Sequence, residues 1–208
     1  MQLQDALGHS ARALTLACVV STALGCGQKP KLVLWFADGS EPPVAGPCAS
    51  PPPAFRCSFA PSIEQCKAQI LNEVRAIYAG LPTEVTTNLP TADVYQTVLI
   101  TSDSRWCGYH PDVGGIAGMS RHCAVRKQGV AVAFDCGGDP RRCARIVAQE
   151  HGHLLGLEHT TGAPDIMNGT LANQASRFAD RDLAIAEPRC QATTQNSYRL
   201  LKARLDEL

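Results

Sequence analysis

Hydrophobic positions along the chain fall into short apolar runs separated by polar and turn-forming segments. Three of these runs are rich in valine, leucine and alanine and are typical of buried strands: Lys31–Ala37, Val94–Thr101 and Gly129–Phe134. A further short extended piece is expected around Ile116 to Ser120. The sequence therefore predicts a sheet whose strands are separated by longer segments of other structure.

Helical spacing appears first after Ser62, which forms a capping-box pattern with Gln65. Apolar residues then recur on one helical face until Gly80-Leu-Pro ends the pattern: Ile63, Cys66, Ile70, Val74 and Ile77. The preceding stretch, Asp38 to Pro61, is rich in proline and cysteine and long for a loop, so we expect disulfides to hold it.

A second helix is predicted from Asp139 as N-cap and Pro140 as first helical residue, and it should end at Gly156. Its inward face is expected to carry Cys143, Ile146, Val147, His153 and Leu154. Two further helices are predicted, at Phe178–Glu187 and Ser197–Leu208, with Pro188 between them.

The end of the second helix carries the most informative chemistry. Gln149 and His153 are four residues apart and share one helical face, with Glu150 beside them. Gly156 permits a left-handed turn that brings His159 back to the same place. Three ligands and one open position indicate a catalytic Zn²⁺ site, with Glu150 as general base on a metal-bound water. His151 points away from this face, as a packed or solvated residue.

This arrangement resembles the metzincin metallopeptidases, whose motif H-E-x-x-H-x-x-G-x-x-H is matched at Glu150, His153, Gly156 and His159. Met167 matches the methionine turn that lies beneath the metal ligands in that family. Gln149 stands in place of the first histidine. The resemblance implies an α/β (α+β) fold with a twisted mixed sheet, a backing helix and an active-site helix. Residues 26–208 would form one catalytic domain, with an upper subdomain to about residue 156 and a smaller helical subdomain over 157–208.

The resemblance further implies a secreted zinc endopeptidase acting on peptide or protein substrates, with Gly115 to Met119 as the edge strand that pairs with substrate. A plain surface loop is the alternative for this segment. Either the amide oxygen of Gln149 or a water would take the third ligand place, and an amide oxygen also favours a harder ion than zinc. The alternative is a catalytically impaired, metzincin-like surface binding protein that keeps the cleft.

Residues 1–25 are predicted to be an export signal, because Arg12 precedes an apolar stretch from Ala13 to Leu24 that is too short to span a bilayer. Ala23-Leu24-Gly25-Cys26 resembles the cleavage box of bacterial lipoproteins, in which Cys26 would be lipidated in the cell envelope. The alternative is ordinary cleavage nearby and free secretion.

Cysteine usage agrees with export. Of ten cysteines, Cys18 lies in the signal and Cys26 at the lipid site. The other eight suit four disulfides: Cys48, Cys57, Cys66, Cys107, Cys123, Cys136, Cys143 and Cys190. Short loops favour the pairs Cys136–Cys143 and Cys107–Cys123, and a thiolate zinc cluster is disfavoured because no C-x-x-C spacing occurs.

The balance of charges argues against binding to nucleic acid or to an anionic membrane. The chain holds 19 basic and 19 acidic side chains, so its net charge predicts binding neither to nucleic acid nor to an anionic membrane surface. Membrane contact is expected only through a lipid anchor, and the protein is expected to be a monomer.

Overall fold

The computed structural model describes residues 29–41, 48, 51–91, 94–120, 122–134, 136–162, 164–170 and 174–208. The predicted signal at 1–25 and the lipidation candidate Cys26 lie outside the described residues. None of the helices in those ranges combines the length and apolar character that a membrane span needs.

Five strands form one mixed sheet in the order β2-β1-β3-β5-β4. The central strands β1 (Lys31–Phe36), β3 (Tyr95–Ile100) and β5 (Gln128–Ala133) are parallel and confirm the three predicted runs. Strand β2 (Glu84–Thr86) extends the sheet on one side. On the other side, β4 (Gly115–Ala117) pairs antiparallel with β5 and is the edge strand predicted near Gly115.

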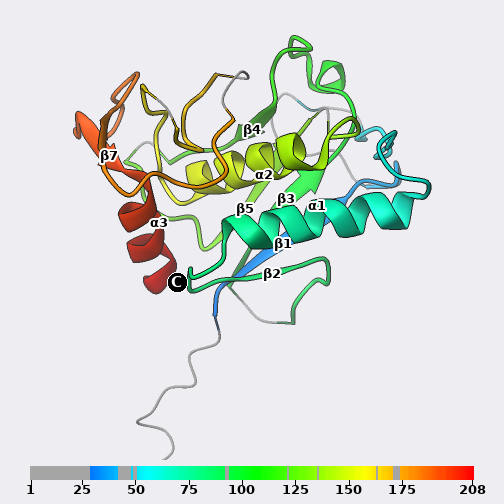
Figure 1. Cartoon of the computed structure of the whole chain (residues 1–208), viewed down its shortest axis with the longest axis horizontal. Coiled ribbons are helices and arrows are strands. Elements are labelled where there is room, and N and C mark those ends of the chain that lie inside the picture. The colour runs from blue at the N-terminus through cyan, green and yellow to red at the C-terminus, as the bar shows by residue number, and fades with distance from the viewer. Residues whose placement is uncertain are drawn as a thin grey trace, which may run out of the picture.

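Two helices, α1 (Ile63–Ile77) and α2 (Pro140–Leu154), lie side by side against one face of the sheet (Figure 1). Their starts follow the predicted capping residues, because Ser62 accepts a hydrogen bond from the Gln65 amide and Asp139 accepts one from the Arg141 amide. The main core lies between these helices and the sheet, which confirms an α/β fold with a backing helix and a motif-bearing helix.

Side chains alternate across the strands, so the opposite face of the sheet carries a second, smaller core. Leu99, Val132 and Phe134 pack there against Cys48 and the short 3-10 helix η1 (Arg105–Cys107). The chain after η1 leads into β4, so the second core supports the sheet edge that carries the candidate site.

Helix α3 (Ser197–Asp206) lies in the C-terminal part, where the sequence predicted it. The helix predicted over Phe178–Glu187 was wrong. Residues Asp182–Ala184 form strand β6, which pairs antiparallel with β7 (Thr194–Asn196). Long-range contacts outweigh local helical spacing here, since the Ala186 amide donates to the carbonyl of His159 at 2.8 Å.

Eight cysteines form four disulfides, as predicted: Cys48–Cys107, Cys57–Cys66, Cys123–Cys190 and Cys136–Cys143. The pair Cys136–Cys143 is confirmed, whereas Cys107–Cys123 was wrong. Cys107 lies in η1 against the second core together with Cys48, and Cys123 lies beside the turn that follows α2, where the C-terminal segment arrives. Four disulfides suit an oxidising compartment.

The disulfides are expected to differ in their contribution to stability. Cys123–Cys190 closes a span of 67 residues and Cys136–Cys143 a span of 7. In the chain-entropy model, replacing the first pair by serine costs about 4 kcal/mol of unfolding free energy and replacing the second about 2 kcal/mol. Urea unfolding of the two double variants measures this difference, and equal losses would contradict the chain-entropy account.

Candidate metal centre

The turn after α2 carries the predicted site. Helix α2 ends at Leu154, and Gly156 adopts the predicted left-handed conformation with φ of 84°. A β-carbon at Gly156 would overlap the carbonyl oxygen of Cys123, so both the backbone angle and the close approach require glycine. The chain then reverses direction and brings His159 back beside the last turn of the helix.

His153 and His159 face one another across this turn. Their Nε2 atoms are 3.0 Å apart, and the two rings meet edge to face with centroids 4.6 Å apart. The Nδ1 atom of His153 lies 2.7 Å from the carbonyl oxygen of Leu157. Because a carbonyl oxygen only accepts, Nδ1 carries the proton and Nε2 presents its lone pair towards His159.

The protonation states of both imidazoles suit a metal ion. Burial lowers the pKa of His153 to about 4, with a smaller contribution from His159. Burial also lowers the pKa of His159, followed by the positive charge of Arg189. Two nitrogen ligands of a tetrahedral zinc ion lie about 3.3 Å apart, close to the separation of these two atoms. The pair therefore fits zinc.

Glu150 is buried on the same side of α2 and lines a cavity of about 250 Å³ together with His153 and His159. Burial raises the pKa of its carboxyl group to about 8. The edge strand forms the opposite wall, where Gly115 lies so close that a β-carbon there would be 2.5 Å from Cγ of Glu150. A glycine at this place in β4 thus leaves room for the carboxyl group.

The side chain of Gln149 is hydrogen-bonded to the backbone of a later turn. Its side-chain amide donates to the carbonyl oxygen of Asn168 at 3.2 Å. Within the described part of the chain, Gln149 is not one of the residues that line the cavity. The structure brings His153, His159 and Glu150 together, and metal binding by Gln149 stays a prediction.

His151 is a packed residue, one of the two possibilities that its position on the helix left open. The hydroxyl group of Tyr78 lies 2.6 Å from its Nδ1, and the side-chain oxygen of Gln96 lies 2.7 Å from its Nε2. Since the Gln96 oxygen accepts, Nε2 is the protonated nitrogen and Nδ1 accepts from Tyr78. Burial lowers the pKa of His151 to about 3, so a neutral imidazole joins α2 to α1 and β3.

Met167 is fully buried beneath α2, where a β-carbon on Gly152 would lie 2.7 Å from the Met167 sulfur. The next turn brings the backbone of Gly169 against the His159 ring, because a β-carbon there would be 3.1 Å from Nδ1. Gly152 and Gly169 therefore allow the methionine and the second histidine to pack closely around the site.

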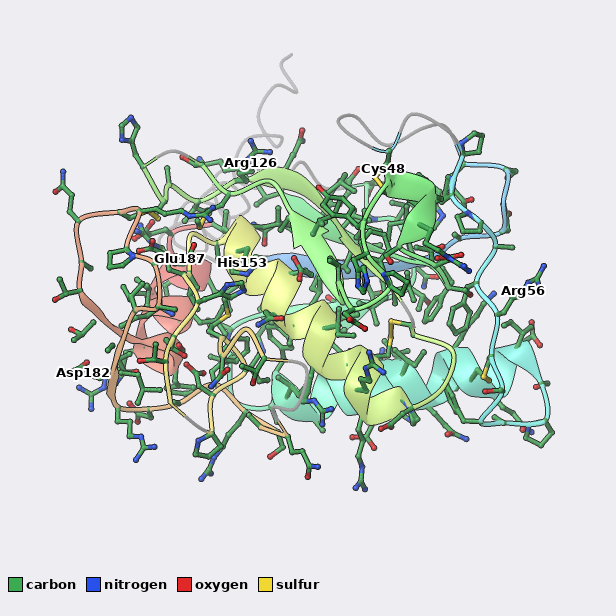
Figure 2. The ribbon with its side chains drawn as sticks, turned by 90° about the horizontal axis from the view of Figure 1, so that it is seen from above. Cys48, Arg56, Arg126, His153, Asp182 and Glu187 are labelled. Carbon is green, nitrogen blue, oxygen red and sulfur yellow. A yellow bond between two sulfur atoms is a disulfide. The ribbon has the colours of Figure 1, made fainter. Side chains whose placement is uncertain are left out.

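Three charged residues of the cavity were missed in the sequence: Glu158, Glu187 and Arg189. Figure 2 shows Glu187 next to His153, although the two residues belong to separate segments. Glu158 precedes His159, but no pattern marks that position of the motif as functional. Glu187 and Arg189 belong to a connection between strands, and only the fold brings that connection to the histidines.

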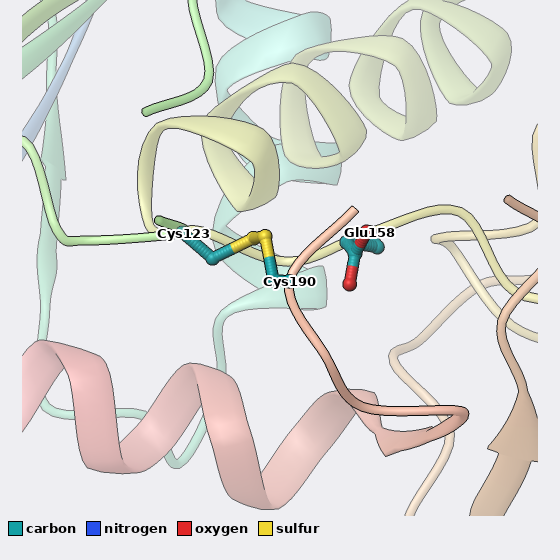
Figure 3. A group of neighbouring side chains, drawn as sticks. All are labelled: Cys123, Glu158 and Cys190. Atoms are coloured by element: carbon teal, nitrogen blue, oxygen red, sulfur yellow. A yellow bond between two sulfur atoms is a disulfide. The ribbon is translucent and has the colours of Figure 1, made fainter. Parts of the chain in front are cut away.

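Cys123, Glu158 and Cys190 gather close to this cavity, with sulfur and carboxylate atoms within 4.8 Å of one another (Figure 3). The two sulfur atoms are joined in a disulfide and supply no thiolate for a metal. The carboxylate of Glu158, which is 4% exposed, accepts a hydrogen bond from the Arg189 amide. This group therefore fixes the C-terminal connection beside the histidines.

Comparison with known proteins gives a limited result. No family model matches the chain, and no match was found among curated proteins. Among solved structures, the chain is similar to archaemetzincin from Methanopyrus kandleri, with 16% identity and a TM-score of 0.45 over 87% of this chain and 98% of that chain. An identity and a TM-score of this size assign neither an activity nor a ligand.

Proposed function

We propose that this chain is a secreted zinc-dependent endopeptidase. The observation that carries the proposal is the pair of neutral imidazoles whose Nε2 atoms lie 3.0 Å apart in one cavity with a buried carboxyl group. His153 and His159 would hold the ion, and Gln149 or a water would take the third place. When bound, zinc acts as a Lewis acid on the peptide carbonyl and lowers the pKa of a coordinated water to about 7.

The residues around the pair have distinct roles in this proposal. The carbonyl of Leu157 fixes the His153 ring with Nε2 towards the cavity. Glu150 takes a proton from the attacking water and delivers it to the leaving amine. Burial alone disfavours the ionised form of the Glu150 carboxyl group. The positive charge of a bound metal ion would favour that ionised form. Met167, packed beneath α2, supports the helix turn that carries the site.

Peptide substrate is expected to bind along β4. This strand ends the sheet and also lines the cavity through Gly115, Ile116 and Ala117. An extended peptide adds to such an edge through main-chain hydrogen bonds, which would place its scissile bond over the histidines.

Metal analysis tests the proposal most directly. The purified protein is expected to hold about one zinc ion per chain, because neutral imidazole nitrogens are zinc ligands. His153→Ala should lose the metal, whereas His110→Ala, which removes an exposed histidine outside the cavity, should keep it. Digestion of a broad peptide library should then depend on the bound metal, and an unaltered library together with an absence of zinc would refute the proposal.

A second candidate, a metzincin-like binding protein with impaired catalysis, is favoured by the hydrogen bond that holds Gln149 against Asn168. Weak metal binding would leave the cleft as a peptide-binding groove. Under this alternative, Glu150→Gln changes no measurable hydrolysis, while a peptide that pairs with β4 still binds.

Gly115→Ala is expected to lower peptidase activity by about tenfold or more, because small displacements of catalytic groups have large effects on rate. The added β-carbon would be 2.5 Å from Cγ of Glu150 and would force that side chain to move. Zinc content should not change, since the atoms nearest to the added β-carbon belong to Glu150 and not to a histidine. Steady-state kinetics with metal analysis measures both, and Gly138→Ala, where no atom lies within 4 Å, is the control.

A further inference from the structure

We infer that Glu187 completes the metal-ligand set with His153 and His159, in the place that residue 149 takes in the three-histidine motif. This inference rests on the proposed function, since it requires that the two histidines bind zinc. Two histidines and one glutamate are an established ligand set for catalytic zinc.

The first support for Glu187 as the third ligand is the hydrogen bond of Gln149. Its side-chain nitrogen donates to the carbonyl oxygen of Asn168, and among the described residues Gln149 does not line the cavity that the two histidines share. An amide oxygen is also a weaker ligand for zinc than an imidazole or a carboxylate. The motif therefore leaves one place to be filled from another part of the chain.

The backbone brings Glu187 to the wall of the same cavity. Residues 185–187 run beside the segment that carries His159, since Ile185 forms an antiparallel bridge with Thr160 and the Ala186 amide donates to the His159 carbonyl at 2.8 Å. After Glu187, the chain is held by the bond from Arg189 to Glu158 and by the Cys123–Cys190 disulfide. The backbone is therefore held by hydrogen bonds before Glu187 and by a hydrogen bond and a disulfide after it, which fixes this residue at the cavity wall.

The side chain of Glu187 is also suited to the role. It lines the cavity, and its negative charge acts on His159. Its ion pair with Arg189 measures 3.5 Å, and the side chains of Glu187 and Arg189 are 80% and 67% exposed. Such an exposed pair is weak and does not prevent the carboxylate from turning towards a cation. Glu158 is less suited, because it is buried and already accepts from the Arg189 amide.

Zinc affinity of the full chain tests the inference by competition with a chromophoric chelator. Glu187→Gln is expected to weaken zinc binding by about 10–100-fold or more, the range for groups that support a metal site. Gln149→Ala should cause a smaller loss. Asp182→Asn removes an exposed carboxylate from the same part of the chain, well apart from His153 in Figure 2, and should change the affinity by less than about fivefold.

Two further measurements separate ligation from other effects of the charge. At 1 M salt the Debye length is about 3 Å, so a long-range effect of Glu187 would vanish whereas the loss of a ligand would persist. Arg189→Gln also breaks the ion pair but keeps the carboxylate, and it should bind zinc at least as tightly as the unaltered chain.

The outcomes are distinct. The inference is overturned if Gln149→Ala loses as much affinity as Glu187→Gln, if the Glu187→Gln loss disappears at 1 M salt, or if Arg189→Gln weakens binding equally. Absence of zinc binding in the unaltered chain would instead refute the proposed function itself. Far-ultraviolet circular dichroism of each variant confirms that the fold is retained.

Discussion

Glu150→Gln is expected to lower kcat for peptide hydrolysis by about 10²–10⁴-fold, the usual contribution of a general base, while zinc content stays at the unaltered level. The substitution keeps the volume of the buried side chain and removes its proton acceptor. Steady-state kinetics on the zinc-loaded protein measures the effect. Glu64→Gln on α1, which changes an exposed glutamate outside the cavity, should leave kcat as it was.

The same variant tests the burial of Glu150 without any substrate. In metal-free protein the folded-state pKa is about 8, above the ordinary value of 4.5, so the unfolded chain loses its proton first as the pH rises. This carboxyl group therefore favours the folded state most at low pH, and that contribution is lost between about pH 4.5 and 8. Glu150→Gln removes it. Chemical unfolding with a chelator present should show stability falling more steeply between pH 6.5 and 8 in the unaltered chain than in the variant.

Identical pH profiles for the two proteins would show that Glu150 is solvated in solution. Unchanged kcat in Glu150→Gln would instead remove it from the reaction. The two readouts are independent, because the first needs no metal and the second needs no stability change.

Gly156→Ala is expected to destabilise the protein by about 3 kcal/mol or more and to weaken zinc binding at the same time. Alanine is strained at φ of 84°, and its β-carbon would overlap the Cys123 carbonyl oxygen. Relief of that overlap must move either the Cys123–Cys190 connection or the turn that carries His159. Chemical unfolding and zinc titration measure the two losses.

Gly80→Ala provides the matched control for this prediction. Gly80 has φ of 86°, nearly the same backbone angle, but no atom lies within 4 Å of a β-carbon there. It should show only the conformational cost, about 1 kcal/mol, with zinc binding intact. Equal losses in the two variants would mean that the close approach to Cys123 contributes nothing.

Local patterns were sufficient for much of the fold. Ser62 and Asp139 cap the two helices as predicted, because a capping hydrogen bond depends on residues within one turn. The three buried strands were also predicted, since apolar runs of this length bury well in a sheet, whereas the edge strand near Gly115 was expected from the family resemblance. Helical spacing failed at Phe178–Glu187, where pairing with Thr194–Asn196 and bonds to the His159 segment prevail.

The arrangement of His153 and His159 was within reach of the sequence, because one helical turn and one left-handed glycine determine it. The hydrogen bond of the Gln149 side chain was not, since its partner is the carbonyl of Asn168 in a later turn. Likewise, the partner of Cys123 depends on the path of the C-terminal segment, which brings Cys190 to it in place of the predicted Cys107.

By itself, the sequence determined the helix that carries the motif, the turn at Gly156 and the convergence of the two imidazoles, because each depends on backbone geometry over a few neighbouring residues. Only the tertiary structure decided which residues surround that pair. Glu187, Arg189 and the Cys123–Cys190 disulfide reach the cavity through strand pairing and chain reversal, and such long-range contacts have no local signal in the order of residues.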